Sequence, residues 1–349
     1  MFIKKAPLSF RMASILVSMV VIIYGLSVLQ DVLIPLIFSA IFAILLLPMC
    51  RFFERIRIPR SLSILLSLII TIAILCVFVY LVYLEIMSFE EILPQLSDKG
   101  EVWFRKVQVF IYQEFNIGRK TQLKEGQKYL TEFVKNNGDI FTNTLSTTTS
   151  FLANLSLIPL YVFLMLLYRD FFHKFLYRAF HSISKHRVDV VVNKIKDVVS
   201  NYVVGLMMVI GIIGTLNSLS LAVLGIEKAI FFGFFAAILV LIPYIGIAIG
   251  SLLPIIMAII TKDSAWYAAG VAISFGAVQF LEGNFITPYI VGSKVSINSL
   301  VAIIALILFG NLWGIAGLVL SYPLTAIIKV IFDSVDSLKP YGFLMGDAE

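Results

Sequence analysis

Long uncharged stretches alternate with short charged ones along the chain. Eight stretches of at least 18 residues contain no Asp, Glu, Lys or Arg: 12–30, 32–50, 61–84, 140–168, 198–226, 229–261, 264–281 and 295–328. A helix of about 20 apolar residues crosses roughly 30 Å of hydrocarbon. Each stretch is long enough to cross a bilayer as a helix, so the pattern predicts an all-α, polytopic membrane protein.

Two of these stretches are too long for a single crossing. Stretches 229–261 and 295–328 contain 33 and 34 residues, which is about 50 Å of continuous helix at 1.5 Å per residue. Each is interrupted near its middle, by IPYIG at 242–246 and by FGNLWG at 309–314. Because proline removes an amide donor and glycine frees the backbone, we expect a broken hairpin of two short arms in each. The alternative is a long, kinked and tilted helix.

The two interrupted stretches also resemble each other. The matching positions are Gly246-Ile247-Ala248 with Gly314-Ile315-Ala316, Pro254 with Pro323, and Gly225 with Gly292. The match predicts a repeat in which one crossing helix precedes one broken hairpin. Since each such unit crosses once, the two copies would be inverted. We therefore expect about six full spans plus two re-entrant-like helical hairpins in an inverted repeat.

Basic residues gather in alternate connections, which predicts the orientation. Three basic residues precede position 12, the link 51–60 has a net charge of +3, and segment 169–197 has a net charge of +4. Positive connections stay on the cytoplasmic side. We therefore expect cytoplasmic N- and C-termini, with the polar stretch after the third span outside the cell.

The spans and connections predict an organisation in five parts. These are 1–84 with the first three spans, 85–149 as an amphipathic extracytoplasmic insert, 150–200 with the fourth span and a basic cytoplasmic helical loop, 201–332 as a core with repeats at about 201–261 and 264–332, and 333–349 as a C-terminal tail.

Composition and charge exclude several classes of protein. The chain is 60% hydrophobic and only 14% charged, which is unlike a water-soluble enzyme. The net charge of +6 is spread between hydrophobic stretches and not along one face, so nucleic acid is not an expected partner. Cys50 and Cys76 fall in or beside apolar stretches, and the three histidines are not on one helical face, so no metal site is predicted. No catalytic or cofactor-binding motif is present in the sequence, and neither an enzyme nor a cofactor is expected.

The most informative ionisable residue is Glu282, which follows an 18-residue uncharged run and precedes 11 further uncharged residues. A carboxylate within a span is unfavourable unless it faces a cavity or a partner. We predict that Glu282 binds or couples substrate or ions, with Gln279 and Asn284 as polar neighbours and Asn217 and Tyr244 as further candidates. The alternative is an interfacial Glu282 that bonds the nearby backbone.

Glycines and prolines are candidates for shaping the backbone around this site. They lie in the two hairpins and in the links: Pro243, Gly246, Pro254, Pro288, Gly292, Gly310, Gly314 and Pro323. The alternative for each is a simple helix kink.

The second half of the chain resembles the autoinducer-2 exporter (AI-2E) family of permease-like bacterial membrane proteins. The resemblance rests on IPYIG at 242–246, EGNFITPYIVG at 282–292 and GNLWGIAGLVLSYPLTAIIKV at 310–330. The order of spans agrees along essentially the whole chain. Two positions depart from the family pattern: Leu206 stands where members usually have glutamine, and Asn298 stands near a frequent proline.

The resemblance implies secondary transport in the bacterial inner membrane. It suggests export of a small polar solute such as the autoinducer-2 signal, or alternatively sodium(lithium)/proton antiport. The expected partners are then the lipid bilayer, a small polar solute and a monovalent cation or proton. The family also implies a homo-oligomer, with pentamers among the forms. An oligomeric pore or a scaffold without coupled transport is a further alternative from a different functional class.

Overall fold

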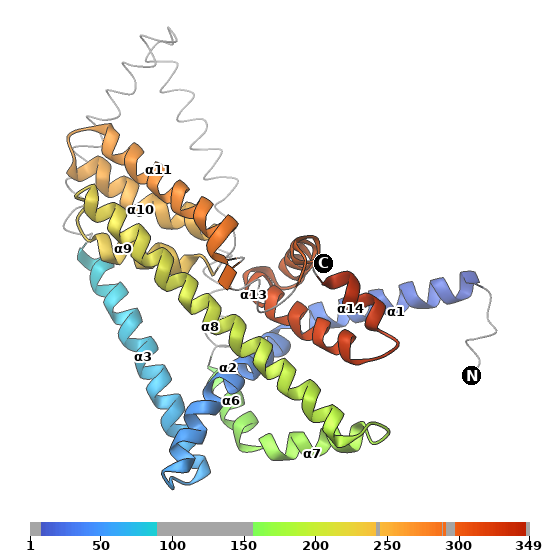
Figure 1. Cartoon of the computed structure of the whole chain (residues 1–349). Coiled ribbons are helices and arrows are strands. Elements are labelled where there is room, and N and C mark those ends of the chain that lie inside the picture. Colours follow the sequence, from blue (N-terminus) through green and yellow to red (C-terminus); the bar gives the residue numbers. More distant parts are fainter. Residues whose placement is uncertain (1–7, 89–155, 242–244, 288, 291–296, 347–349) are drawn as a thin grey trace.

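The computed structural model describes residues 8–88, 156–241, 245–287, 289–290 and 297–346. In chain order its elements are α1 (Leu8–Val28), α2 (Gln30–Arg55), α3 (Arg60–Ser88), α6 (Leu157–Leu167), α7 (Arg169–Ala179), α8 (Lys185–Val223), α9 (Ala229–Leu239), α10 (Ile245–Thr261), α11 (Ala265–Leu281), the π-helical turn η2 (Glu282–Ile286), α13 (Ser299–Ser334) and α14 (Lys339–Met345) (Figure 1). Almost all of the predicted insert 85–149 lies outside the described residues.

The prediction of an all-helical, polytopic membrane protein is confirmed. Within the described residues, five helices are long and apolar enough to span a membrane: Gln30–Arg55, Arg60–Glu85, Lys185–Val223, Trp266–Ile286 and Ser299–Ser334. The first predicted span is helical as α1. The fourth is helical over α6, and its earlier residues lie outside the described part. Each of the six expected spans is therefore helical where the structure describes it.

Helix α8 differs from the prediction because it joins two expected elements. The basic segment near 171–200 and the following span were expected as separate helices, yet α8 continues without interruption for 39 residues, roughly 58 Å at 1.5 Å per residue. No proline or glycine occurs between Val190 and Val204, so nothing in the sequence ends the helix there. The predicted boundary at 200/201 falls inside α8. The helix forms a long axis on which the later elements pack.

Ion pairs at the basic end of the molecule join the α2–α3 link to α6 and α7. Arg169 donates to a carboxylate oxygen of Glu54 at 2.7 Å. Arg60 donates to Asp170 at 2.6 Å and to the carbonyl oxygen of Leu166 at 2.7 Å. The hydrogen bond from Arg60 holds the pKa of Asp170 below its usual value, which keeps the pair charged at neutral pH. The two links predicted as cytoplasmic therefore meet at one end.

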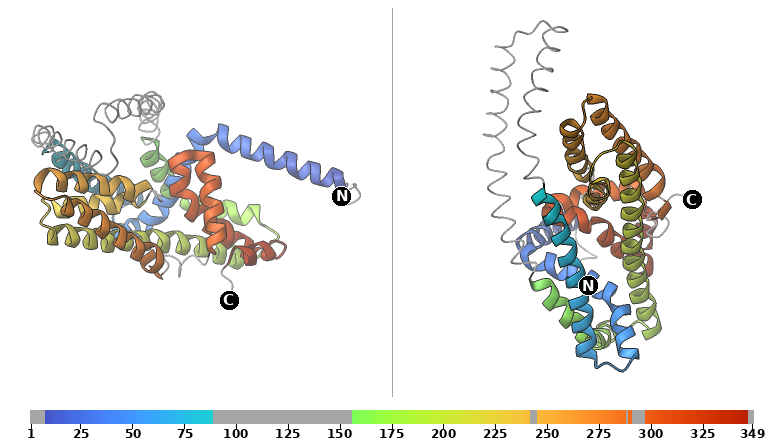
Figure 2. Two further views of the ribbon diagram at one scale, coloured as in Figure 1. Left: turned by 90° about the horizontal axis from the view of Figure 1, so that it is seen from above. Right: turned by 90° about the vertical axis from the view of Figure 1, so that its left-hand side faces the viewer.

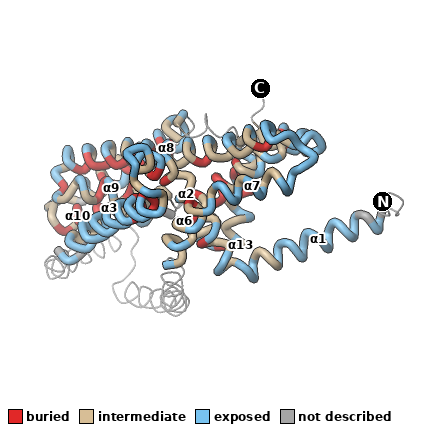
Figure 3. The backbone as a smooth tube through the Cα atoms, turned by 90° about the horizontal axis from the view of Figure 1, so that it is seen from below, coloured by how far each residue is buried: buried red, intermediate tan, exposed pale blue. Residues whose placement is uncertain are grey.

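Helices α1 and α3 expose most of their apolar side chains, as the pale blue tube in Figure 3 shows. Buried residues concentrate instead where α8, α9, α10 and α11 face each other. Exposed apolar surface of this extent is unfavourable in water and suits hydrocarbon or another subunit. This distribution is that of a membrane protein whose tightest packing lies in its second half.

The C-terminal helix α14 is attached to the start of α13 by Asn298. The side-chain oxygen of Asn298 accepts from the amide of Val301 at 2.9 Å and caps α13. Its side-chain nitrogen donates to the carbonyls of Leu344 at 2.7 Å and Gly346 at 2.9 Å, and its own amide donates to Met345 at 3.0 Å. A proline at this position would lack all of these bonds.

The two roles of Asn298 can be separated by substitution. We expect Asn298→Asp to keep the cap but to release α14, because a carboxylate cannot donate to the carbonyls of Leu344 and Gly346. Hydrogen exchange within 339–345 should accelerate about ten-fold, since a lost hydrogen bond of this kind is worth about 1–2 kcal/mol. Asn298→Ala should also fray the first turn of α13. Equal exchange in the wild type and Asn298→Asp would contradict this role.

Candidate functional site

Stretch 229–261 forms a helical hairpin. Helices α9 and α10 pack against each other, and a Cβ atom at Gly246 would overlap the carbonyl oxygen of Leu239. Further along, a Cβ at Gly250 would lie 2.7 Å from the Cα of Ala236. Such close approach of two backbones requires glycine at the crossing. The two arms, of 11 and 17 residues, therefore fold back on each other.

Both ends of this first hairpin lie at the Val223 end of α8. Helix α8 ends at Val223, and Gly225, two residues later, has a φ of +66°. A Cβ at that glycine would lie 3.1 Å from Nζ of Lys262, which follows α10. Lys228, just before α9, forms an ion pair of 2.6 Å with Glu85 near the end of α3. The first hairpin thus starts and finishes beside the same end of α3.

Stretch 295–328 also folds back, within α13. The helical backbone breaks at Trp313 and at Gly314, which has φ 59° and ψ −136°. A Cβ at Gly317 would overlap the carbonyl oxygen of Phe309, and one at Gly310 would lie 2.7 Å from the side chain of Leu318. Figure 2 shows the two arms lying side by side. The long-helix alternative does not describe either stretch.

The second hairpin has its ends at the opposite end of α8. Asn298, at its start, is bonded to the residues of α14. Asp336, after its end, lies 3.4 Å from Arg187 in the first turn of α8. In the second arm, Tyr322 stacks on Tyr202 of α8 with ring centroids 6.3 Å apart. The two hairpins therefore have their bases at opposite ends of α8.

Both hairpins contribute to one buried group, which we call the central cluster. Its members come from α8, α9, α11 and α13: Val209, Ile210, Ile213, Ala237, Val278 and Ala326. Val240 and Leu241, at the tip of the first hairpin, pack against it, and so do Ile286 and Ile290 after α11. The tip of the first hairpin thus ends at mid-height of α8, where η2 begins.

Glu282 lies at this level, as the first residue of η2, and is 9% exposed. Its Oε2 accepts from Nε2 of Gln279 at 2.9 Å, and its Oε1 accepts from Oγ1 of Thr287. In an α-helix residues i and i+5 do not share a face. The wider π-helical turn brings Thr287 back over Glu282, and such turns are frequent at functional sites.

The partners of Glu282 supply hydrogen bonds but no charge. Both donors, the Gln279 amide and the Thr287 hydroxyl, are neutral. Among the described residues, no ion pair involves Glu282. A carboxylate within a spanning segment is unfavourable unless it faces a cavity or a partner. The carboxylate and hydroxyl oxygens of this arrangement are ligands that a small cation could use.

Asn217 lies at a different level of the molecule from Glu282. Leu221 clusters with Val271 and Phe275, whereas the central cluster joins Val278 to Ile210 and Ile213, so α11 runs antiparallel to α8. This register places Asn217 roughly two turns of α8 away from the level of Glu282.

Asn217 and Asn284 differ in environment. Asn217 is 4% exposed, and its Oδ1 has no hydrogen-bond partner within the described residues. Asn284 is exposed and donates to the carbonyl of Phe280 in its own helix. Tyr244, Pro243, Pro288 and Gly292 lie outside the described residues.

Pro254 and Pro323, two of the candidates for shaping the backbone, lie inside helices and do not end them. Helix α10 runs through Pro254, and the second arm of α13 runs through Pro323. Both are buried. A proline interior to a helix removes one hydrogen bond, and neighbouring helices can compensate for it within a membrane. The breaks occur instead where glycines allow a close crossing or a positive φ.

Sequence reasoning missed two residues of the site. Thr287 lies five positions after Glu282, a spacing that pairs with it only through the π-helical turn. Leu206 packs against the central cluster from α8, close to the level of Glu282. The sequence did mark Leu206 as a departure from the family pattern, but it did not indicate which residues lie beside it.

The family model described as AI-2E family transporter matches residues 16–337. The chain belongs to the AI-2E transporter family. AI-2 transport protein TqsA of Escherichia coli (strain K12) is 24% identical over 337 residues, covering 94% of this chain and 93% of its own. YrrI of Bacillus subtilis (strain 168), whose name also places it among transport proteins, is 25% identical over 313 residues, covering 87% and 86%.

Membership of the AI-2E family and the spanning helices agree on the class of protein. The chain is a multi-pass membrane protein of a transporter family, and the resemblance inferred from the motifs at 242–246, 282–292 and 310–330 is confirmed.

Proposed function

We propose that this AI-2E family member is a secondary-active exporter of a small polar solute such as the autoinducer-2 signal, with Glu282 as the binding or coupling carboxylate. The observation that carries the proposal is the buried carboxylate of Glu282 beside the tip of the first hairpin, whose hydrogen-bond donors among the described residues are neutral. Broken hairpins that meet near the middle of a membrane protein are typical of transporter sites. TqsA, a relative along most of the chain, is named for AI-2 transport.

In the proposed mechanism, protonation or cation binding at Glu282 changes its hydrogen bonds. The ionised carboxylate accepts from both Gln279 and Thr287. A protonated carboxyl must donate from one oxygen. A proton on Oε2 breaks the bond from Gln279, and a proton on Oε1 makes the Thr287 hydroxyl the acceptor, so in either case the contacts that hold η2 change. Helix α8 and the elements that follow it, which include the predicted core 201–332, would then move together as the transport core against the first four spans. The ion pair between Glu85 and Lys228 would stabilise one of the two conformations, because it joins the end of α3 to the start of the first hairpin.

Sodium(lithium)/proton antiport is the second candidate, and one observation favours it. The Glu282 carboxylate and the Thr287 hydroxyl form a compact set of oxygen atoms, which are the ligands that hard cations prefer. The side chain of Leu206 offers no hydrogen bond to a solute at the same level. A homo-oligomer with Glu282 lining a pore is the alternative without coupling.

We further propose that the protein lies in the bacterial inner membrane with both termini in the cytoplasm. The support is that the basic links 51–60 and 169–197 meet through the Arg169–Glu54 ion pair, and that α14 lies near the same end of α8. The exposed apolar faces of α1 and α3 leave room for lipid or for further copies of the chain.

These candidates are separated by flux measurements on the purified protein in proteoliposomes. Accumulation of autoinducer-2 against its gradient, only when a proton gradient is imposed, is the result expected for coupled export. Proton movement driven by sodium or lithium without solute would favour antiport. Solute flux that is indifferent to ion gradients would identify a pore, and no flux of either kind would contradict transport by this chain.

A further inference from the structure

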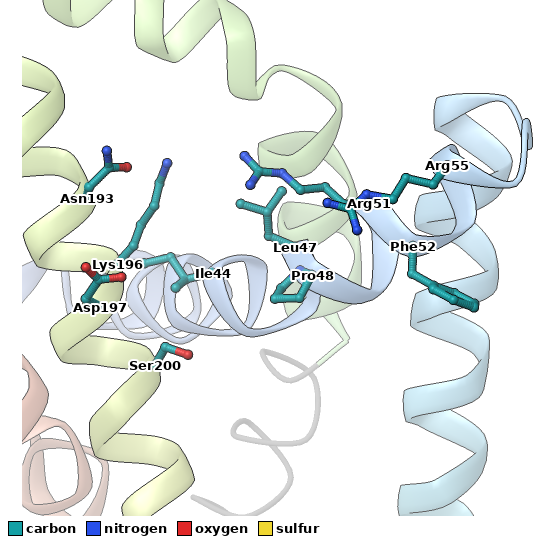
Figure 4. A pocket seen from close by; sticks show the side chains of 10 residues that line it. All are labelled: Ile44, Leu47, Pro48, Arg51, Phe52, Arg55, Asn193, Lys196, Asp197 and Ser200. Carbon is teal, nitrogen blue, oxygen red and sulfur yellow. The ribbon is translucent and has the colours of Figure 1, made fainter.

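A cleft of about 380 Å³ lies between the end of α2 and the beginning of α8, at the end of the molecule opposite the base of the first hairpin. Figure 4 shows Arg51 and Arg55 reaching from α2 toward the side of Lys196 on α8. Asn193 and Ser200 line the cleft on the α8 side and add polar groups. Two arginines, one lysine and two neutral polar side chains therefore border one space.

The three cations of the cleft differ from other basic residues at this end of the molecule. Arg60, Arg169 and Arg187 each form an ion pair, with distances of 2.6, 2.7 and 3.4 Å. By contrast, no ion pair of Arg51, Arg55 or Lys196 occurs within the residues that the structure describes. Asp197 also lines the cleft, so its net charge is +2. Like charges held together repel each other, and an anion in the cleft would relieve the repulsion.

The cleft lies at a boundary between polar and apolar sequence. Arg51 is the first charged residue after the uncharged stretch 32–50, and Asp197 is the last before the stretch 198–226. The cleft is also lined by Ile44, Leu47 and Pro48, which belong to the apolar part of α2. One side of the cleft is therefore cationic and the adjoining side is apolar, as at the surface of a bilayer.

We propose that this cleft binds the phosphate of an anionic phospholipid from the leaflet on the basic side of the membrane. Arginines bind phosphate oxygens through two parallel hydrogen bonds, and basic pockets between spanning helices are suited to lipid headgroups. Asn193 and Ser200 can bond the glycerol of the headgroup, while the acyl chains follow the apolar wall of α2. A soluble phosphate compound could bind the same cations, but it has no acyl chains to pack against the apolar side of α2. The proposal does not depend on the solute or on the role of Glu282.

The test measures binding of fluorescent phosphatidylglycerol to the full chain in neutral detergent micelles, with phosphatidylcholine as the zwitterionic comparison. Replacing Arg51, Arg55 and Lys196 together by glutamine should weaken phosphatidylglycerol binding at least about ten-fold. The matched control replaces Arg57, Lys174 and Lys194, which also removes three positive charges from this end but none from the cleft. The control should change binding less than about two-fold.

A second, single variant tests the proposal even if the triple variant does not fold. Asp197→Asn removes the only acidic side chain that lines the cleft and should tighten phosphatidylglycerol binding about two- to three-fold, while leaving phosphatidylcholine binding unchanged. Equal losses in the two triple variants, no preference for phosphatidylglycerol, or weaker binding by Asp197→Asn would overturn the proposal. Displacement of the lipid by millimolar inorganic phosphate would assign the cleft to a soluble phosphate compound and overturn the lipid as its occupant.

Discussion

Replacing Glu282 by glutamine is expected to abolish the response of transport to a proton gradient and to lower the transport rate at least about ten-fold. Glutamine has nearly the same shape, but it can neither release a proton nor carry a negative charge. Hydrogen bonds to a charged group are worth about 1.5–3 kcal/mol each. Loss of the charge therefore weakens the hydrogen bonds from Gln279 and Thr287 and removes the group that we propose binds the coupling ion. Both effects are measured as initial transport rates in proteoliposomes over a range from about pH 5.5 to about pH 8.5.

The matched control for this experiment is Glu227→Gln. Glu227 is an exposed carboxylate in the link between α8 and α9, so the substitution makes the same chemical change away from the central cluster. Its rate and its pH dependence should stay close to those of the wild type. An unchanged rate and pH profile in Glu282→Gln would show that this carboxylate is not the coupling group.

Replacing Gly317 by alanine is expected to destabilise the protein by about 3 kcal/mol or more, because the new methyl group would overlap the carbonyl oxygen of Phe309 in the facing arm. The obstacle is backbone and not a flexible side chain, so the two arms of α13 must separate. Separation removes the packing that holds Trp313 beside Leu26, whose carbonyl accepts from the Trp313 indole at 3.1 Å. Thermal unfolding in detergent measures the loss.

The control for the hairpin crossing is Gly276→Ala in α11. A Cβ at Gly276 has no heavy atom within 4 Å. Alanine is a better helix former than glycine by up to about 1 kcal/mol, so this variant should be as stable as the wild type or slightly more stable. The two substitutions are chemically identical and should act in opposite directions. A Gly317→Ala protein as stable as Gly276→Ala would mean that the arms of α13 are not in close contact.

The broken hairpins were predictable because length and local chemistry agree. A stretch of 33 or 34 uncharged residues exceeds one crossing, and glycine or proline near its middle makes a turn favourable. The sequence did not distinguish a hairpin from a kinked helix. That choice depends on whether the arms can approach closely, and it is decided by Gly246 and Gly317 against the backbone of the opposite arm. Pro254 and Pro323, equally prominent in the sequence, only lie within the arms.

The candidate site was predictable in part. Glu282 was singled out because a carboxylate is rare within apolar stretches, and Gln279 followed from helical spacing. Thr287 could not be found in this way, because it reaches Glu282 through a π-helical turn. Asn217 was grouped with Glu282 on polarity alone, whereas the antiparallel register of α8 and α11 puts it at another level.

The sequence by itself determined four features: the membrane class, the helical spans, the two interrupted stretches and the carboxylate of Glu282 between uncharged stretches. These follow from hydrophobicity, helix length and charge, each of which is a property of consecutive residues. Only the tertiary structure decided that the hairpins approach along α8 from opposite ends, that η2 and the tip of the first hairpin pack against the same central cluster, and that Arg51, Arg55 and Lys196 border one cleft. Those features depend on how residues far apart in the sequence pack against each other, and no local pattern contains that information.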